Sequence, residues 1–281
     1  YGMLVEKWIF ICFYTVVWHI TKTAANLGDV TEGSVHRNKD DELERVREFG
    51  GFYTFNETLA IFTDKQYEND VRIQGLLKTF RRHCPYEDFI PTSEKKTSRK
   101  FPFIVVEGIP RNTRNIVTKK LSRKVRGRHV FTPPAFMLAL GESFNTTHKM
   151  RRAYFTLAVY GTACEIENLI NIQPVVTTGY WIDQTAFSIV LSFPDKLPPA
   201  DSPIFKWPID LLTPDIIFFV NPPITTSNFP VSSEYKTKKT EIFRRWREPR
   251  IIEINTTRIY NEIVNNIVHH LNTTLDFTFD Y

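Results

Sequence analysis

A dense run of basic side chains between residues 95 and 128 is the first feature that could carry chemistry. Twelve of these residues are Lys or Arg and one, Glu107, is acidic, so the stretch carries a local charge of +11, against +5 for the whole chain. The cations are Lys95, Lys96, Arg99, Lys100, Arg111, Arg114, Lys119, Lys120, Arg123, Lys124, Arg126 and Arg128. Such a field attracts phosphates, nucleic acids or acidic surfaces. The same pattern is also typical of a solvated helix face, because Val117, Leu121 and Val125 recur between the charges at helical spacing.

Other site chemistries find no support in the sequence. None of the seven histidines has metal-ligand spacing to a Cys, Asp or Glu. No G-x-S-x-G nucleophile elbow and no catalytic-cysteine signature occurs. The sequence therefore predicts no metal site.

The first 25 residues predict a secretory signal peptide. Lys7 precedes the apolar run Trp8–Ile20, and the small residues Ala24 and Ala25 follow it. Thirteen helical residues cover about 20 Å, which is short of the roughly 30 Å hydrocarbon core, so no stable membrane span is expected. The run contains no Arg, unlike a mitochondrial transit peptide. We expect the secretory pathway or the extracellular space.

Acceptor sequons and cysteines agree with export. The four possible glycosylation sites are Asn56, Asn145, Asn255 and Asn272. Cys12 would leave with the signal peptide, so that Cys84 and Cys164 remain either as one disulfide or as two unpaired thiols.

Apolar strands alternate with helices from residue 99 onward. The predicted strands are residues 101–108, 174–177, 215–220 and 250–254, and the predicted helices are residues 114–125, 150–169 and 257–271. This order implies a parallel sheet with helices on both faces. We assign residues 99–273 to this domain, 26–98 to an N-terminal extension of unknown role, and 274–281 to a tail.

Six ordered segments of this domain resemble the thymidylate kinase-like family, and most closely its mitochondrial UMP-CMP kinase 2 branch. They are FPFIVVEG, TPP, RRAYFTLAVYGTACEI, PVVTTGYW, LPPADSPIFKWPIDLLTPD and IIEINTTRIYNEIVNNIV. The resemblance implies a P-loop-type three-layer α/β/α fold, the nucleoside monophosphate kinase fold.

The phosphate-binding motif of this family is degenerate here. Against G-x-x-x-x-G-K-[ST], the chain keeps Gly108 but has Thr113 for the second Gly, Arg114 for the Lys and Asn115 for the hydroxyl residue that ligates Mg²⁺. Arg and Lys differ in shape and hydrogen-bonding geometry, and Pro110 removes a loop N–H. The loop therefore lacks several of the groups that hold a triphosphate.

Two further elements of the family are altered. Thr178 and Gly179 stand where the family places an Asp-Arg pair. The lid region retains Lys236, Lys238, Lys239, Arg244 and Arg245, which we expect to be surface charges. Arg151 and Arg152 match a basic pair on the helix that lines the acceptor-phosphate pocket.

These changes predict a catalytically degenerate nucleoside monophosphate kinase-like protein that acts by binding a nucleotide, another polyanion or a protein. One alternative is a divergent active kinase that transfers phosphate from ATP to UMP, CMP or dTMP. Another is a polyanion-binding module that uses residues 95–128. No cofactor is expected unless the active-kinase alternative holds, which would require Mg²⁺ and ATP. The family resemblance also leaves a mitochondrial location open.

Overall fold

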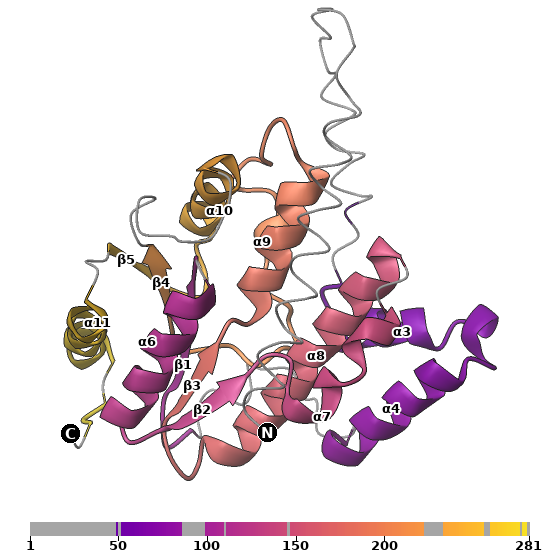
Figure 1. The fold of residues 1–281 in the computed structure, drawn as a ribbon, viewed down its shortest axis with the longest axis horizontal. Helices are drawn as coiled ribbons and strands as arrows, with labels where there is room; N and C mark the ends of the chain where they lie inside the picture. Colours follow the sequence, from indigo (N-terminus) through magenta and orange to yellow (C-terminus); the bar gives the residue numbers. More distant parts are fainter. Residues whose placement is uncertain are drawn as a thin grey trace, which may run out of the picture. The chain divides into compact units, whose positions relative to one another are not determined.

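The computed structural model describes residues 49, 52–85, 99–109, 111–144, 147–221, 233–255, 259–275 and 277–279. Their centre is a parallel sheet of five strands in the order β2-β3-β1-β4-β5 (Figure 1). The strands are β1 (Phe103–Gly108), β2 (Arg128–Phe131), β3 (Val175–Thr178), β4 (Ile216–Asn221) and β5 (Ile251–Asn255).

Helices cover both faces of this sheet. One face carries α6 (Arg111–Lys124) and α11 (Tyr260–Thr274), and the other carries α8 (His148–Leu169), α9 (Trp181–Ser192) and α10 (Ser233–Arg245). Alternate strand residues supply the two cores: Phe103 and Val105 face α8 and α9, whereas Ile104 and Val106 face α6. A strand that is buried on both faces appears in the sequence as a continuous apolar run. The predicted three-layer α/β/α fold class is confirmed.

The boundaries of the predicted elements shift by a few residues. The helix predicted from Arg114 begins at Arg111, and the final helix runs from Tyr260 to Thr274. The earlier start of α6 matters for the site, because it shortens the turn that follows β1.

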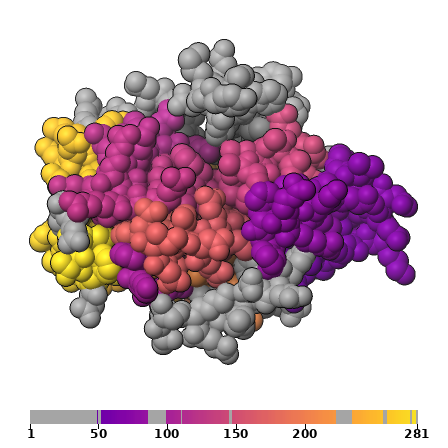
Figure 2. All heavy atoms as spheres, turned by 90° about the horizontal axis from the view of Figure 1, so that it is seen from below, coloured from indigo at the N-terminus to yellow at the C-terminus, as the bar shows by residue number. Residues whose placement is uncertain are grey.

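The described part of the N-terminal extension shares the core of the sheet domain. It forms α3 (Phe55–Phe62), the short 3-10 helix η1 (Lys65–Tyr67) and α4 (Val71–His83). Both α3 and α4 pack on α8, as does η4 (Gly141–Phe144), and α4 also packs on α7 (Ala135–Leu138). Figure 2 shows the indigo atoms of this segment lying directly against the pink atoms of α8. A disulfide joins Cys84 to Cys164 of α8, with their Cα atoms 5.7 Å apart.

Three of the four sequon asparagines lie among the described residues, and all three are exposed: Asn56, Asn255 and Asn272. Asn145 and the predicted signal peptide, residues 1–25, lie outside the described residues. Within the described ranges, no helix combines the length and the apolar character needed to cross a membrane.

Asp210 connects the extension to the sheet domain. Its Oδ2 accepts the backbone N–H of Phe55 at 2.7 Å, which is the first residue of α3, and its Oδ1 accepts the Tyr160 hydroxyl at 2.6 Å. A carboxylate at a helix N-terminus satisfies a free N–H and favours the helix dipole. One side chain therefore fixes the start of α3 against α8.

We expect Asp210→Ala to lower the free energy of unfolding by roughly 2–4 kcal/mol, because two hydrogen bonds to a charged group are lost. Urea denaturation measures the change. Asp201→Ala, at an exposed position before η5 (Pro203–Phe205), is the matched control and should remain near the parent value. Equal effects of the two substitutions would contradict the assigned role.

Candidate functional site

The carboxyl ends of β1 and β3 mark the switch point of the sheet. These strands are neighbours, yet α6 follows β1 onto one face and α9 follows β3 onto the other. In open parallel sheets, ligands bind in the crevice at such a point. Gly108 at the end of β1 and Thr178 at the end of β3 both lie there, which makes this edge the candidate site.

The turn after β1 does not form the predicted phosphate-binding loop. Because α6 begins at Arg111, only two residues separate Gly108 from the helix, and Thr113, Arg114 and Asn115 are all helical. A phosphate loop needs the residues between its two glycines as an open turn whose N–H groups, together with the start of the helix, surround the phosphate. Here the helix already begins at Arg111, before the position of the second glycine.

Gly108 has a packing reason to be glycine. Its φ is +141°, and a Cβ at this position would lie 2.2 Å from the carbonyl oxygen of Val220 on β4. Only glycine accommodates both the conformation and the contact. Packing against β4 therefore accounts for the glycine at this position of the motif without a bound phosphate.

Arg114 points into the protein and pairs with buried carboxyl groups. Its Nη1 lies 2.8 Å from Oδ1 of Asp183 and 3.4 Å from Oε2 of Glu107. The ammonium of Lys239, on α10, donates to the same Asp183 oxygen at 2.6 Å. The side chains of Arg114 and Lys239 are each 8% exposed. We call Glu107, Arg114, Asp183 and Lys239 the switch-point cluster.

The two carboxyl groups of the cluster hold their protons differently. Burial and the neighbouring Asp183 carboxylate together raise the pKa of Glu107 to about 8. Arg114 lowers this pKa, but by less than Asp183 raises it. Burial alone would raise the pKa of Asp183, but Arg114 and Lys239 together hold it below its usual range. At neutral pH, Asp183 is ionised between two cations, while Glu107 is largely protonated and accepts the N–H of Tyr180 at 2.9 Å.

Gly179 fits the inward position of Arg114. Its φ is +71°, and a Cβ there would lie 3.4–3.5 Å from the guanidinium of Arg114. Next to it, the hydroxyl of Thr178 lies 2.8 Å from Nε2 of His129, and Thr132 donates to the Gly179 carbonyl at 3.0 Å. The structure thus brings Thr178 and Gly179 beside Arg114, where a charged side chain at position 179 would be strained by the positive φ.

The cations of the predicted lid lie on α10 and its end. Lys238 contacts Glu234 and the Pro194 carbonyl, and Arg244 binds Glu253 through two N–H groups at 2.9 and 3.0 Å. Lys239 was expected at the surface, and that prediction is wrong, because Asp183 draws its ammonium into the cluster. Arg245 contacts Glu241 and the Pro198 carbonyl, and Lys236 is half-buried on α10.

The predicted acceptor-side arginines are engaged by the protein itself. Arg152 donates to the Phe49 carbonyl, and its guanidinium lies 4.9 Å from the centre of the Phe49 ring. Arg151 lies 5.6 Å from the centre of the Phe155 ring. Tyr53 of the extension packs edge-on against Trp181 at 6.1 Å. Phe49, from the N-terminal extension, therefore lies against one of the two arginines that would face an acceptor.

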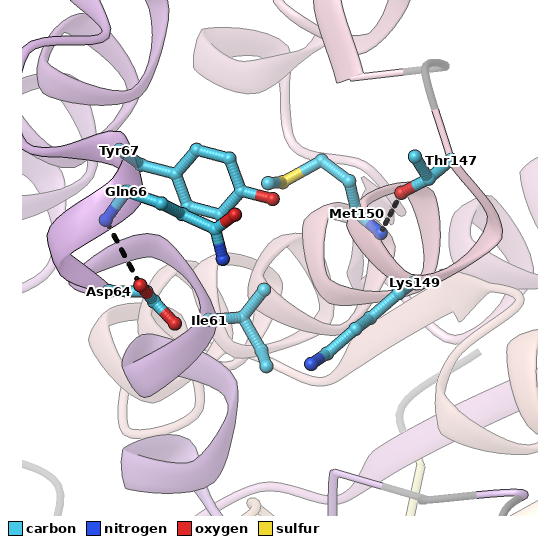
Figure 3. A pocket seen from close by; sticks show the side chains of 7 residues that line it. All are labelled: Ile61, Asp64, Gln66, Tyr67, Thr147, Lys149 and Met150. Atoms are coloured by element: carbon cyan, nitrogen blue, oxygen red, sulfur yellow. Dashed lines mark hydrogen bonds between the residues drawn. The ribbon is translucent and has the colours of Figure 1, made fainter.

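One pocket lies away from the switch point, between the α3–η1 segment and the start of α8 (Figure 3). Ile61, Asp64, Gln66, Tyr67, Thr147, Lys149 and Met150 line it. Asp64 accepts the N–H of Gln66 and Thr147 accepts the N–H of Met150, so two of its polar groups cap helices. No group of His, Cys, Asp and Glu among the described residues is placed to hold a metal ion.

Comparisons with known proteins agree with this architecture. No family model matches the chain. Over 125 residues, 43% of this chain, the sequence is 28% identical to mitochondrial UMP-CMP kinase 2 of Homo sapiens. The match spans 28% of the length of that protein. The thymidylate kinase of Candida albicans superposes with a TM-score of 0.50 at 14% identity, over 66% of this chain and 99% of that enzyme. The structural likeness concerns the fold.

We expect Asp183→Asn to lower the free energy of unfolding by roughly 3 kcal/mol, because two buried cations lose their carboxylate. Chemical denaturation followed by circular dichroism tests this. Asp201→Asn, an identical change at an exposed position, is the matched control. A parent-like Asp183→Asn protein would show that the cluster does not hold α9 and α10 together.

The raised pKa of Glu107 predicts a pH dependence of stability. The folded protein holds this proton up to pH about 8, whereas the ordinary value is 4.5, so the contribution of Glu107 is complete below pH 4.5 and is lost as the pH rises towards 8. Glu107→Gln keeps a neutral side chain. Relative to that variant, the parent should lose unfolding free energy between pH 5 and 9. The exposed Glu142→Gln controls for the charge change, and parallel profiles for parent and Glu107→Gln would contradict the prediction.

Proposed function

Since this chain has the thymidylate kinase fold and resembles UMP-CMP kinase 2 in sequence, we propose that it is a catalytically degenerate nucleoside monophosphate kinase-like protein, which acts by binding rather than by phosphoryl transfer. The observation that carries this proposal is the inward position of Arg114, paired with Asp183 at 2.8 Å.

A magnesium-bound triphosphate would meet the wrong electrostatics at this position. The only cation at the lysine position of the motif already neutralises Asp183, and the Glu107 carboxyl lies beside it. To reach a phosphate, Arg114 would have to leave a buried carboxylate unpaired on one side, at a cost of several kcal/mol. A phosphate that came to Arg114 would instead approach an anionic carboxylate.

The other groups that phosphoryl transfer requires are also lacking among the matched positions. Asn115 offers no hydroxyl to Mg²⁺, and neither Thr178 nor Gly179 carries a charge. On α10, Lys239 is held by Asp183 and Arg244 by Glu253. This combined loss supports a binding function better than a weakened enzyme, because each change affects the same transferred phosphate.

We also propose that the protein enters the secretory pathway and is glycosylated. The apolar run Trp8–Ile20 and the exposed positions of Asn56, Asn255 and Asn272 support this. Expression of the full chain in cultured animal cells, followed by glycosidase digestion, tests the proposal. Recovery from mitochondria, without a shift in mobility after digestion, would support the location implied by the family resemblance instead.

We expect no magnesium-dependent formation of ADP when the full chain is incubated with ATP and UMP, CMP or dTMP. Working kinases turn over at about 1–100 s⁻¹. The expected rate lies at least a thousandfold below that range and is the same for the parent and for Arg114→Ala. Isothermal titration should likewise detect no magnesium-dependent ATP binding.

Magnesium-dependent ADP release by the parent would overturn the proposal if it disappears in Arg114→Ala. With circular dichroism showing that the variant is folded, this result would establish a divergent active kinase.

A further inference from the structure

A cationic surface with exposed rings lies where α6 meets the edge of the sheet. β2 is the outermost strand on its side (Figure 1), so one of its edges has no neighbouring strand within the described part of the sheet. Three exposed cations and two rings gather there: Lys119, Arg123, Arg126, His129 and Phe131. We call these five residues the α6–β2 face. It is separate from the switch-point cluster.

Strand alternation places the rings on the same side of the sheet as α6. Val130 belongs to the core under α8, so its neighbours His129 and Phe131 point to the opposite face, which α6 covers. Their ring centres lie 4.1 Å apart. Phe131 remains 51% exposed, because α6 packs mainly over β1 and β3 and leaves the edge strand partly open.

The cations of this face lie on α6 and on the turn that follows it. Burial lowers the pKa of His129 to about 4, and the nearby charges of Lys119 and Arg128 contribute to that lowering. Arg123 lies one helical turn after Lys119 on the same side of α6. Lys120, by contrast, points towards α11, where its ammonium donates to Asn261 at 3.0 Å.

The stretch that carries this face, between residues 108 and 141, contains no Asp or Glu. Arg128 lies on the α8 side of β2 together with Val130, near the half-buried Glu165. Like charges at i and i+4, such as Lys119 and Arg123, destabilise a helix by a few tenths of a kcal/mol. The helix dipole offsets this for Arg123 in the last turn of α6 but not for Lys119. The repulsion between Lys119 and Arg123 is a cost to the helix that an anionic ligand would relieve.

We propose that the α6–β2 face binds single-stranded nucleic acid. The phosphates would lie along Lys119, Arg123 and Arg126, and a base would stack on the exposed ring of Phe131. Cations that follow a backbone beside an aromatic ring are the recurring chemistry of single-strand recognition. A sulfated polysaccharide could use the cations but has no use for Phe131. This binding does not depend on whether the switch-point cluster is catalytic.

Fluorescence anisotropy of the full chain with labelled oligothymidylate of about 20 nucleotides tests the proposal. Affinity should fall steeply between 50 and 200 mM salt, with a slope of about 0.7 per phosphate contact. Lys119→Ala should weaken binding about tenfold and reduce that slope by about one contact. Phe131→Ala should weaken binding about tenfold and leave the slope unchanged. Lys120→Ala, which removes an equal charge on the α11 side, should change affinity by less than twofold.

Three results would overturn the proposal. One is an affinity that does not respond to salt, or the absence of binding at 50 mM salt. Another is an equal loss in Lys119→Ala and Lys120→Ala, which would indicate non-specific attraction. The third is a Phe131→Ala variant with parental affinity, together with equal binding of heparin, which would assign the surface to sulfated polysaccharides. Thermal melts of each variant confirm folding.

Discussion

The buried ion pair between Arg114 and Asp183 governs the carboxyl edge of the sheet. A guanidinium that is 8% exposed and lies 2.8 Å from a carboxylate is a fixed structural contact. It joins α6 to α9, and Lys239 extends the contact to α10. Three helices from both faces of the sheet therefore converge on a single carboxylate. Because the same cation cannot also neutralise a phosphate, stability and phosphate binding compete for Arg114.

Backbone geometry supports this arrangement. Gly179, with φ at +71°, lies directly beside the guanidinium, and the turn after Gly108 is short enough for Arg114 to lie in the first turns of α6. Changing Arg114 to Lys alone would not recreate a phosphate loop, since Arg111, Asn112 and Thr113 would still be helical. The loss of phosphate chemistry thus resides in the path of the backbone as well as in the side chains.

Several features of this fold could be predicted from sequence because they depend on continuous apolar patterns. β1 and β4 are buried on both faces and appear as unbroken apolar runs, and α8 also extends over its predicted range. β2 was missed because it buries only Val130 among its four residues, so no run exists to detect. α10 was missed because Lys and Arg dominate its sequence, and its position follows from tertiary packing.

The candidate site was predicted in part. Sequence comparison located Arg114, Thr178 and Gly179, which the structure brings together. It could not show where Arg114 points, since that depends on Asp183, a residue remote in sequence from β1. Glu107 did leave a signal: a carboxyl group at the end of an apolar strand needs a partner. Lys239 left none, because a buried lysine and a surface lysine look alike in a basic helix.

The charges of the switch-point cluster and those of the α6–β2 face differ in burial and in pairing. At the switch point, two cations share one ionised carboxylate and are shielded from water, so their charges act mainly on groups inside the protein. On the α6–β2 face, Lys119 and Arg123 are exposed. An exposed field acts on approaching ligands, whereas a buried, paired field stabilises the fold. If this protein binds an anionic partner, electrostatics favour the outer surface of α6 over the crevice in which related enzymes bind nucleotides.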